Sequence, residues 1–450
     1  MISIDRQRLK SLMAREQTRF VDDRPRSKAL FERARGSLLG GVPMNWMVKW
    51  AGAFPPFAQE ARGAHLLDVD GHRYVDFCLG DTGAMTGHSP EATVSAVGQQ
   101  VSRGITTMLP LEDAVWVGEE LQRRFGLPYW QFTLTATDAN RFSIRLARQI
   151  TGRPKILVFN WCYHGSVDET FITLADGVTK PRSGNIGPPV DPSQTTRVVE
   201  FNDLEGLERA LTPRDVACIL AEPVMTNVGI VHPEPGFHRD LRQLARRFGT
   251  LLIMDETHTI CAGPGGCTRA DGLEPDFLVF GKPIGGGVPG AAYGFTREVA
   301  ERIARRQSLE DCDTGGIGGT LAGNALSLAA MRATLEKVLT DAAFAHMFSM
   351  AERWTAGVAQ CVADSGVPWH VTRLGCRAEY LFSPRPPRNG SQAHAAMDFE
   401  LERFMHLYAM NRGILLTPFH NMALMCPATS PEDIDHHTRV FQDGVKELTG

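Results

Sequence analysis

The residue with the most distinctive chemical setting in this sequence is Lys282. It follows the apolar run 277–280, and the three glycines 285–287 come almost directly after it. Lysine is rarely buried, because an ammonium group loses its hydration there. A lysine at the end of a buried strand, in a loop too rich in glycine to shield it, suits an amine that traps a carbonyl group. An exposed lysine at the end of a strand is the alternative that this segment alone leaves open.

A second apolar run, 251–254, ends in the acids Asp255 and Glu256. In open α/β sheets, ligands bind outside the carboxyl ends of the strands, so we expect Asp255 and Lys282 at the same edge. Pyridoxal phosphate needs such a pair: the lysine forms a Schiff base with it, and the acid pairs with its pyridinium nitrogen. The protonated ring then withdraws electrons from a carbanion on the substrate. An aspartate that caps the helix after a strand is the alternative for Asp255.

Seven short patterns follow one another along nearly the whole chain. They read Asp-Gly-His-Arg-Tyr-Val-Asp-Phe at 70–77, Gly-His-Ser-Pro at 87–90, Phe-Asn-Trp-Cys-Tyr-His-Gly at 159–165, Ala-Glu-Pro at 221–223, Asp-Glu-Thr at 255–257, Gly-Lys-Pro-Ile-Gly-Gly-Gly at 281–287 and Gly-Thr-Leu-Ala-Gly-Asn at 319–324. In this order they resemble the motifs of class III aminotransferases of fold type I. The resemblance is to the glutamate-1-semialdehyde aminomutase-like branch and to ω- and amine transaminases, and it implies pyridoxal 5'-phosphate as the cofactor.

The phosphate of that cofactor is expected at a helix N-terminus, where backbone N–H groups can bind an anion. Thr135, Ala136 and Thr137 lie between the strand 130–133 and an amphipathic helix, and we assign phosphate binding to them. The family usually has Ser-Gly-Thr here, so Ala136 adds a methyl group where a glycine is usual. A helix cap without a ligand is the alternative.

The resemblance gives roles to five further residues. Tyr163 would stack on the pyridine ring, and Glu222 would lie near its 3-hydroxyl side. Thr257 and His258 stand where apolar residues are usual, so they either change the tilt of the ring or supply a polar group. A histidine that only hydrogen-bonds to a neighbouring residue is the alternative for His258. Thr320 would reach the phosphate of a neighbouring subunit. The resemblance therefore implies a homodimer with shared active sites.

The substrate is less well defined. A glutamate-1-semialdehyde aminomutase is expected to carry an arginine in the segment 42–50, and this segment has none. We therefore favour an aminotransferase that moves an amino group from an amine or a β- or ω-amino acid to a keto acid or aldehyde such as pyruvate, with ping-pong kinetics. Trp46 is a candidate for the pocket wall, and Lys49, Arg377 and His420 are candidates for binding a carboxylate. An ion pair with Glu379 is the alternative for Arg377.

Three other functions stay open. One is the 2,1-aminomutase, which transfers the amino group within one molecule. Another is a different reaction on the same cofactor, such as racemisation, decarboxylation or elimination, because a fold does not fix a function. The last is a relative that binds the cofactor without turnover, against which the presence of both Asp255 and Lys282 argues.

The pattern of elements predicts an α/β fold with a doubly wound, mainly parallel sheet, because short apolar strands alternate with helical stretches from about residue 90 to 305. We expect an N-terminal arm and small-domain segment in 1–75, a large domain in 76–330 and a C-terminal small α+β domain in 331–450. Residues 64–77 predict a hairpin that turns at Asp70-Gly71. The clearest strands are 130–133, 155–159, 217–221, 251–254 and 277–280, with small-domain strands at 378–382 and 413–417. The segment 181–194 is either a lid or a plain surface loop.

The overall composition argues against several classes of function. The formal net charge of −4 gives no reason to expect a nucleic acid or an anionic membrane as partner. The nine cysteines form no Cys-x-x-Cys pair, so we expect neither a metal site nor a disulfide framework. No apolar run reaches the roughly 18 residues of a membrane helix. The first 35 residues are rich in arginine but also carry acids, unlike a transit peptide, so we expect a helical arm and a cytoplasmic protein.

Overall fold

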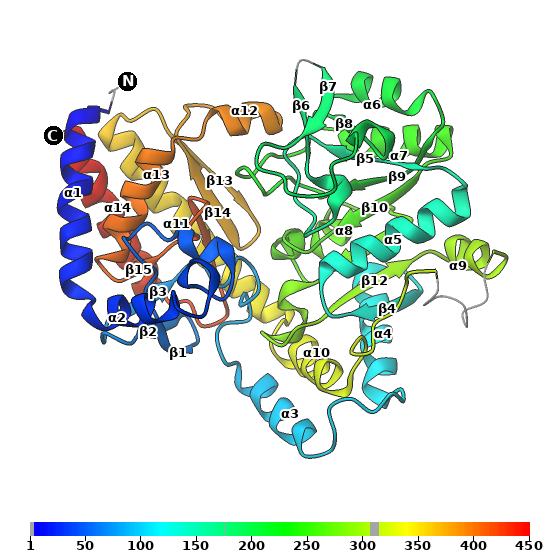
Figure 1. Ribbon diagram of the computed structural model, residues 1–450, viewed down its shortest axis with the longest axis horizontal. Helices are drawn as coiled ribbons and strands as arrows, with labels where there is room; N and C mark the ends of the chain where they lie inside the picture. Colours follow the sequence, from blue (N-terminus) through cyan, green and yellow to red (C-terminus); the bar gives the residue numbers. More distant parts are fainter. Residues whose placement is uncertain (1–3, 176, 307–314) are drawn as a thin grey trace. The chain divides into compact units, whose positions relative to one another are not determined.

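The computed structural model describes residues 4–175, 177–306 and 315–450. The chain divides into two compact units, each built from segments that are distant in the sequence (Figure 1). The first unit contains Met1–Pro90, Ala342–Pro386 and Ala396–Gly450. The second unit contains Glu91–Asp341 and Pro387–Ala395.

The second unit is built on a seven-stranded sheet of order β4-β12-β11-β10-β9-β5-β8. Neighbouring strands are parallel, except that β12 is antiparallel to both β11 and β4. The strands are β4 (Tyr129–Thr133), β5 (Lys155–Phe159), β8 (Thr196–Val199), β9 (Val216–Ala221), β10 (Leu251–Asp255), β11 (Phe277–Phe280) and β12 (Ala291–Phe295). The mainly parallel sheet predicted from the sequence is confirmed. Strands β8 and β12 are additional to the predicted strands.

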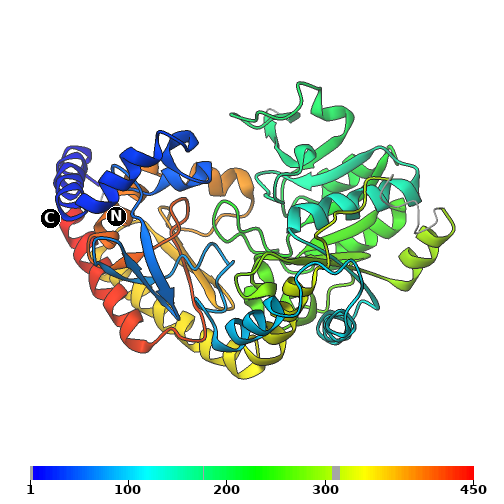
Figure 2. The ribbon, with the colours of Figure 1, turned by 60° about the horizontal axis from the view of Figure 1, so that its bottom comes forward.

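Helices cover both faces of this sheet (Figures 1 and 2). Alternate side chains of each strand point to opposite faces, and both faces are apolar, so each face buries its own cluster. Ile253 of β10 belongs to one cluster, and its neighbours Leu252 and Met254 belong to the other. The first face packs on α5 (Ala136–Thr151) and α9 (Arg297–Ala304), and the second on α6 (Leu204–Leu211) and α7 (Phe237–Phe248).

Further helices, a hairpin and 3-10 turns complete the second unit. Helix α10 packs on α3 and α4. The helices are α3 (Glu91–Val101), α4 (Glu112–Phe125), α8 (Gly266–Ala270), α10 (Ala325–Lys337) and α12 (Gly390–Ala395). The hairpin is β6 (Ile172–Ala175) with β7 (Val178–Pro181), and the 3-10 turns are η3 (Asp168–Thr170), η4 (Pro192–Gln194), η5 (Thr259–Ala262) and η6 (Lys282–Gly285).

The first unit holds two small sheets of order β1-β2-β3-β15 and β13-β14-β16. The predicted hairpin is present, because β2 and β3 pair antiparallel, and the N-terminal arm forms two helices. The strands are β1 (Ala58–Arg62), β2 (His65–Asp68), β3 (Arg73–Asp76), β13 (His370–Leu374), β14 (Arg377–Leu381), β15 (Ile414–Leu415) and β16 (Met422–Leu424). The helices are α1 (Arg6–Asp23), α2 (Pro25–Ala34), α11 (Asp341–Ser365), α13 (Phe399–Met410) and α14 (Pro431–Thr449), with turns η1 (Leu39–Gly41) and η2 (Asn45–Lys49).

The described residues contain neither a membrane-spanning helix nor a cluster of metal ligands. Every helix in that part of the chain is too short or too polar to span a lipid bilayer. The same residues contain no group of three or more histidine, cysteine, aspartate or glutamate side chains arranged to hold a metal ion.

Candidate active site

The carboxyl ends of β10 and β11 place Asp255 and Lys282 at one edge of the sheet. The two strands are parallel, and Asp255 pairs with Val279. The register continues one residue further, because the Glu256 N–H donates to the Val279 carbonyl at 2.8 Å. Beyond this point the side chains of the two strand ends meet, with the ε-amine of Lys282 2.9 Å from Nε2 of His258. The common edge expected from the sequence is therefore present.

Lys282 begins η6 with an uncommon backbone. Its φ is 46°, in the left-handed region that non-glycine residues rarely adopt. Gly281 precedes it, and a Cβ atom there would lie 2.9 Å from the Cβ of Ala136 and 3.4 Å from its nitrogen. The missing side chain thus lets the lysine turn pack directly on the first turn of α5. Backbone conformations of this kind concentrate at functional sites, where the surroundings hold them in place.

The first turn of α5 has the form of an anion site. The side chain of Thr135 caps the helix by accepting from the Asp138 N–H at 3.1 Å. The N–H groups of Ala136 and Thr137 have no acceptor within the helix, and the helix dipole favours a negative charge beside them. All three residues assigned to the phosphate therefore occupy the start of one helix.

The loop after β5 packs against this turn. The Thr137 hydroxyl accepts a hydrogen bond from the Ser166 N–H at 3.1 Å. A Cβ atom at Gly165 would lie 2.1 Å from that hydroxyl, and its φ is 74°, so the position requires glycine. This contact fixes the loop that carries Tyr163 and His164 against the proposed phosphate site.

Asp255 is buried and is surrounded by donors. Its Oδ2 accepts from Nδ1 of His164 at 2.9 Å and from Nδ2 of Asn140 at 2.8 Å, and its Oδ1 accepts from the Thr257 N–H at 3.1 Å. Burial is the largest influence on its pKa and opposes ionisation, but His164, Thr257 and Asn140 outweigh it and lower the pKa to about 2. The carboxylate therefore stays charged, as a partner for a protonated ring nitrogen must.

His164 and Asn140 received no role in the sequence analysis. Burial lowers the pKa of His164, but Cys162 and Asp255 outweigh burial and raise it to about 10. His164 was part of a quoted motif, beside Tyr163. The sequence pattern does not show that its ring turns toward Asp255, because that contact joins residues 91 positions apart.

The other predicted cofactor residues lie in the same unit. Tyr163 is 40% exposed and meets Phe171 edge-on, with ring centroids 6.3 Å apart. Glu222 follows β9, is buried, and accepts a hydrogen bond from the Thr226 hydroxyl. Thr320 lies in the exposed loop before α10. The roles of Tyr163, Glu222 and Thr320 at the cofactor stay predictions.

The predicted substrate residues belong to the first unit. The Trp46 ring meets the Phe419 ring edge-on at 6.1 Å, and the ε-amine of Lys49 lies 5.2 Å from the centroid of Phe419. Trp46 and Lys49, which are in η2, thus share one aromatic neighbour.

Arg377 and His420 share a buried carboxylate. Nη2 of Arg377 lies 3.5 Å from Oε2 of Glu379, and Nδ1 of His420 lies 3.3 Å from Oε1 of the same residue. The ion pair considered as the alternative for Arg377 is therefore present. Glu402 is also buried beside this group. Burial raises its pKa to about 7, although His420 and Lys49 act against the shift.

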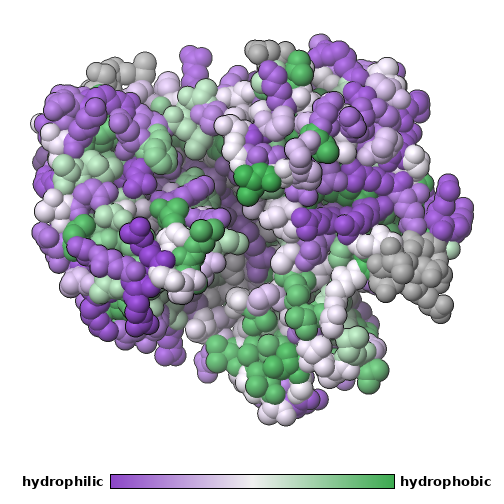
Figure 3. All heavy atoms as spheres, in the orientation of Figure 1, coloured by the Kyte–Doolittle hydropathy of each residue, from purple (hydrophilic) through white to green (hydrophobic). Residues whose placement is uncertain are grey.

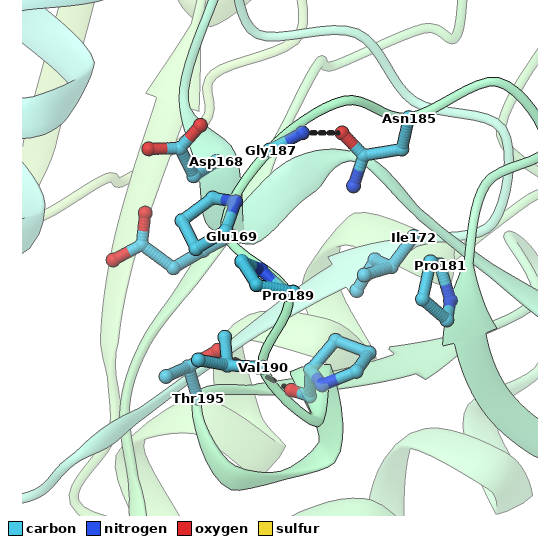
Figure 4. A pocket seen from close by; sticks show the side chains of 11 residues that line it. Asp168, Glu169, Ile172, Pro181, Asn185, Gly187, Pro189, Val190 and Thr195 are labelled. Atoms are coloured by element: carbon cyan, nitrogen blue, oxygen red, sulfur yellow. Dashed lines mark hydrogen bonds between the residues drawn. The ribbon is translucent and has the colours of Figure 1, made fainter.

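A separate cavity of about 530 Å³ lies beneath the loop 181–194 (Figure 4). Asp168 and Glu169 line one side of it and Ile172 and Pro181 another, and Arg148 pairs with Glu169 at 2.7 Å. None of the residues predicted to bind the cofactor lines this cavity. The loop therefore lines a cavity that contains none of the predicted cofactor residues.

Comparison with known proteins decides the family. The sequence model described as Aminotransferase class-III matches residues 47–441. The chain belongs to the class III aminotransferases. This class III aminotransferase is 33% identical over 433 residues to a glutamate-1-semialdehyde 2,1-aminomutase of Desulfitobacterium hafniense, covering 94% of the chain and 98% of that protein.

Solved structures agree with this assignment. A glutamate-1-semialdehyde-aminomutase from Pseudomonas aeruginosa PAO1 is 51% identical to the aminotransferase, with a TM-score of 0.97 over 99% of both chains, and one of its structures is a complex with PMP. An omega-transaminase from Sphaerobacter thermophilus is 29% identical, with a TM-score of 0.85 over 94% of this chain and 98% of that one. The fold type I architecture and the aminomutase branch predicted from the sequence are confirmed.

The cofactor of this aminotransferase is pyridoxal phosphate, and the residues present fit it. The first turn of α5 suits the phosphate, the charged Asp255 suits a protonated ring nitrogen, and Lys282 supplies an amine at the same edge of the sheet. Gly281 and Gly165 leave room beside that turn, since a side chain at either position would collide with α5.

Proposed function

We propose that this class III aminotransferase is a glutamate-1-semialdehyde-type 2,1-aminomutase, which moves an amino group between neighbouring carbons of one substrate. The observation that carries the proposal is the 51% identity to the Pseudomonas aeruginosa aminomutase, with a TM-score of 0.97 over 99% of both chains. Curated relatives with the same activity in their names support it. The comparisons thus favour the function kept as an alternative in the sequence analysis over the amine transaminase preferred there.

In this proposal the groups at the strand ends and at the first turn of α5 have distinct tasks. The bound cofactor supplies a carbon that carries the amino group and a ring that withdraws electrons. Lys282 would hold the cofactor through its ε-amine, and the same amine would move a proton during the reaction. Asp255 keeps a proton on the ring nitrogen, and His164 keeps Asp255 charged. The first turn of α5 holds the phosphate.

Intermolecular amino transfer is the second candidate. The observation that favours it is the segment 42–50, which lacks the arginine expected for the carboxylate of glutamate-1-semialdehyde. The relative from Sphaerobacter thermophilus, an omega-transaminase, agrees with it. In either reaction Trp46, Lys49, Arg377 and His420 remain the proposed substrate contacts. A positive charge on Arg377 or Lys49 would attract a substrate carboxylate.

Product analysis separates the two candidates. The purified protein, loaded with cofactor, is given glutamate-1-semialdehyde with no amino acceptor, and the products are identified by mass spectrometry. An aminomutase converts the substrate into the isomeric amino ketone, and the total amount of amine is unchanged. A parallel reaction contains an (S)-arylalkylamine and pyruvate. Formation of alanine and a ketone in this reaction, without isomer in the first, would establish the transaminase and contradict the aminomutase.

We also propose that the protein works as a homodimer. The second unit carries an apolar patch around α3 and the loops near it, visible as the green area at the bottom of Figure 3. Exposed apolar patches of this kind mark interaction surfaces. The exposed residues of this region are Val94, Val101, Ile105, Met108, Leu109, Val115 and Leu321. Leu321 follows Thr320, the residue predicted to reach a neighbouring subunit, so a second copy that covers the patch would also meet Thr320.

A further inference from the structure

The contact between His258 and Lys282 joins a basic side chain to the amine that must become a nucleophile. The separation between His258 Nε2 and Lys282 Nζ is 2.9 Å, a hydrogen-bond distance. His258 stands three residues beyond Asp255, at the turn into η5, and is half-buried, whereas its neighbours Thr257 and Thr259 are buried. The end of β10 and the turn after it therefore carry two polar side chains: the Asp255 carboxylate contacts His164, and the His258 imidazole contacts Lys282.

The direction of this hydrogen bond follows from charge. A Lys282 ammonium can only donate, so the Nε2 atom that faces it must be the acceptor. A protonated imidazole would place two positive charges 2.9 Å apart, which is unfavourable. The neutral ring with its proton on Nδ1 is therefore the form that faces the ammonium.

The acids on the same strand end are engaged elsewhere. Asp255 accepts from His164, Asn140 and the Thr257 N–H. Glu256 accepts hydrogen bonds from the hydroxyls of Thr259 and Thr268 and from the N–H groups of Cys267 and Thr268. Both carboxylates therefore already accept hydrogen bonds from donors other than Lys282.

From this geometry we propose that His258 is a positioning residue that also takes the proton from Lys282. A lysine ammonium has no lone pair and cannot attack a carbonyl carbon. When Nε2 of His258 takes one proton, the neutral amine can form the carbon–nitrogen bond, and the carbonyl oxygen leaves as water with the two remaining amine protons. The half-buried imidazolium then returns its proton to solvent. This inference rests on the proposed role of Lys282, and it holds for an aminomutase and a transaminase alike.

The test follows attachment of the cofactor and needs no substrate. Apo-protein is mixed with pyridoxal phosphate, samples are reduced with borohydride at set times, and mass spectrometry measures the fraction linked to Lys282. We expect His258→Ala to slow the linkage about 100-fold, the scale of a lost general base. Free imidazole, added at increasing concentration, should restore the rate. A missing structural contact would not respond to imidazole in this way.

Two other variants keep the test decisive. His258→Gln preserves the size of the side chain and an acceptor atom but cannot take a proton, so its linkage should also be slow. His436→Ala is the matched control, because His436 is half-buried in the other unit and has its Nε2 2.8 Å from the Arg412 carbonyl; it should match the unmodified protein.

The outcomes distinguish a failure of the proposed role of His258 from a failure of the proposed role of Lys282. Linkage at the unmodified rate in His258→Ala or His258→Gln, or a slow His258→Ala that imidazole does not restore, would overturn the role of His258. If His258→Ala does not fold, the rate of His258→Gln decides. If the unmodified protein forms no link at Lys282, the proposed role of Lys282 fails instead.

Discussion

At Asp255 the protein keeps a carboxylate charged although it is buried. Burial alone would favour the neutral acid, yet the hydrogen bonds and positive charge around it hold its pKa at about 2. The strongest of these influences comes from His164 Nδ1 at 2.9 Å. The acid that we propose to control the ring nitrogen therefore depends on a second residue that need not touch the cofactor.

Replacing His164 should make the activity sensitive to acid. In His164→Gln the positive charge is gone and burial acts with less opposition, so the pKa of Asp255 rises. Asp255 then becomes neutral as the pH falls through the new value, and activity should be lost on that side while persisting at higher pH. The pH profile of kcat checks this.

Asp255→Asn removes the negative charge of this side chain at every pH. We expect this variant to bind cofactor and to have a kcat at least about 100-fold lower at every pH. An unchanged acid limb in His164→Gln would contradict this account.

Among the structural elements, the turn η6 depends on its contact with α5. Gly281→Ala places a Cβ atom 2.9 Å from that of Ala136, so the lysine turn must shift. Overpacking of this kind costs about 1–3 kcal/mol. We expect a lower midpoint of thermal unfolding and slower linkage of cofactor to Lys282. Gly287→Ala is the comparison, since nothing lies within 4 Å of a Cβ there, although its φ of 103° adds backbone strain. Normal linkage in Gly281→Ala would show that this close packing is not needed.

Helix α13 carries a pH-dependent cost to stability. The pKa of Glu402 is raised from 4.5 to about 7 by burial, so the folded state binds its proton more tightly than the unfolded state. The stability that protonated Glu402 contributes is fully present below about pH 4.5 and is lost as the pH rises to about 7. This loss in the free energy of unfolding is at most about 3 kcal/mol. Glu402→Gln should be no more stable than the unmodified protein below pH ~4.5 and more stable above pH ~7. Urea unfolding midpoints across this range check it; parallel curves for the two proteins would contradict it.

The elements around the site could largely be predicted, because each carries a local signal. The apolar runs 251–254 and 277–280 identified β10 and β11, and strand polarity placed Asp255 and Lys282 at one edge. The reversed strand β12 was missed, since its direction depends on pairing with β4, far away in the sequence. The contacts of His164 with Asp255 and of His258 with Lys282 were missed as well, because they depend on how side chains from separate loops turn.

For the whole molecule, the proposed homodimer predicts the mass of the protein in solution. Covering the apolar patch removes hydrophobic surface from water, which favours association. Light scattering on a sizing column should therefore give twice the chain mass of 49.5 kDa. Met108→Glu with Leu109→Lys, in the exposed part of the patch, should shift the protein toward the monomer and weaken cofactor binding, if Thr320 acts across the interface. The control is a variant in which two exposed arginines, Arg209 and Arg305, are changed to serine. A monomer in the unmodified protein would contradict the proposal.

The proposed active site depends on Lys282 carrying the cofactor, and an absorbance spectrum tests this most directly. Unmodified protein and Lys282→Ala are each loaded with pyridoxal phosphate, and the cofactor that remains after gel filtration is recorded and then reduced with borohydride. We predict that the unmodified protein shows the band of a lysine-linked cofactor and yields a labelled Lys282 peptide, while Lys282→Ala keeps cofactor without that band. The same band in Lys282→Ala, or a label on another lysine, would contradict the assignment of the active site.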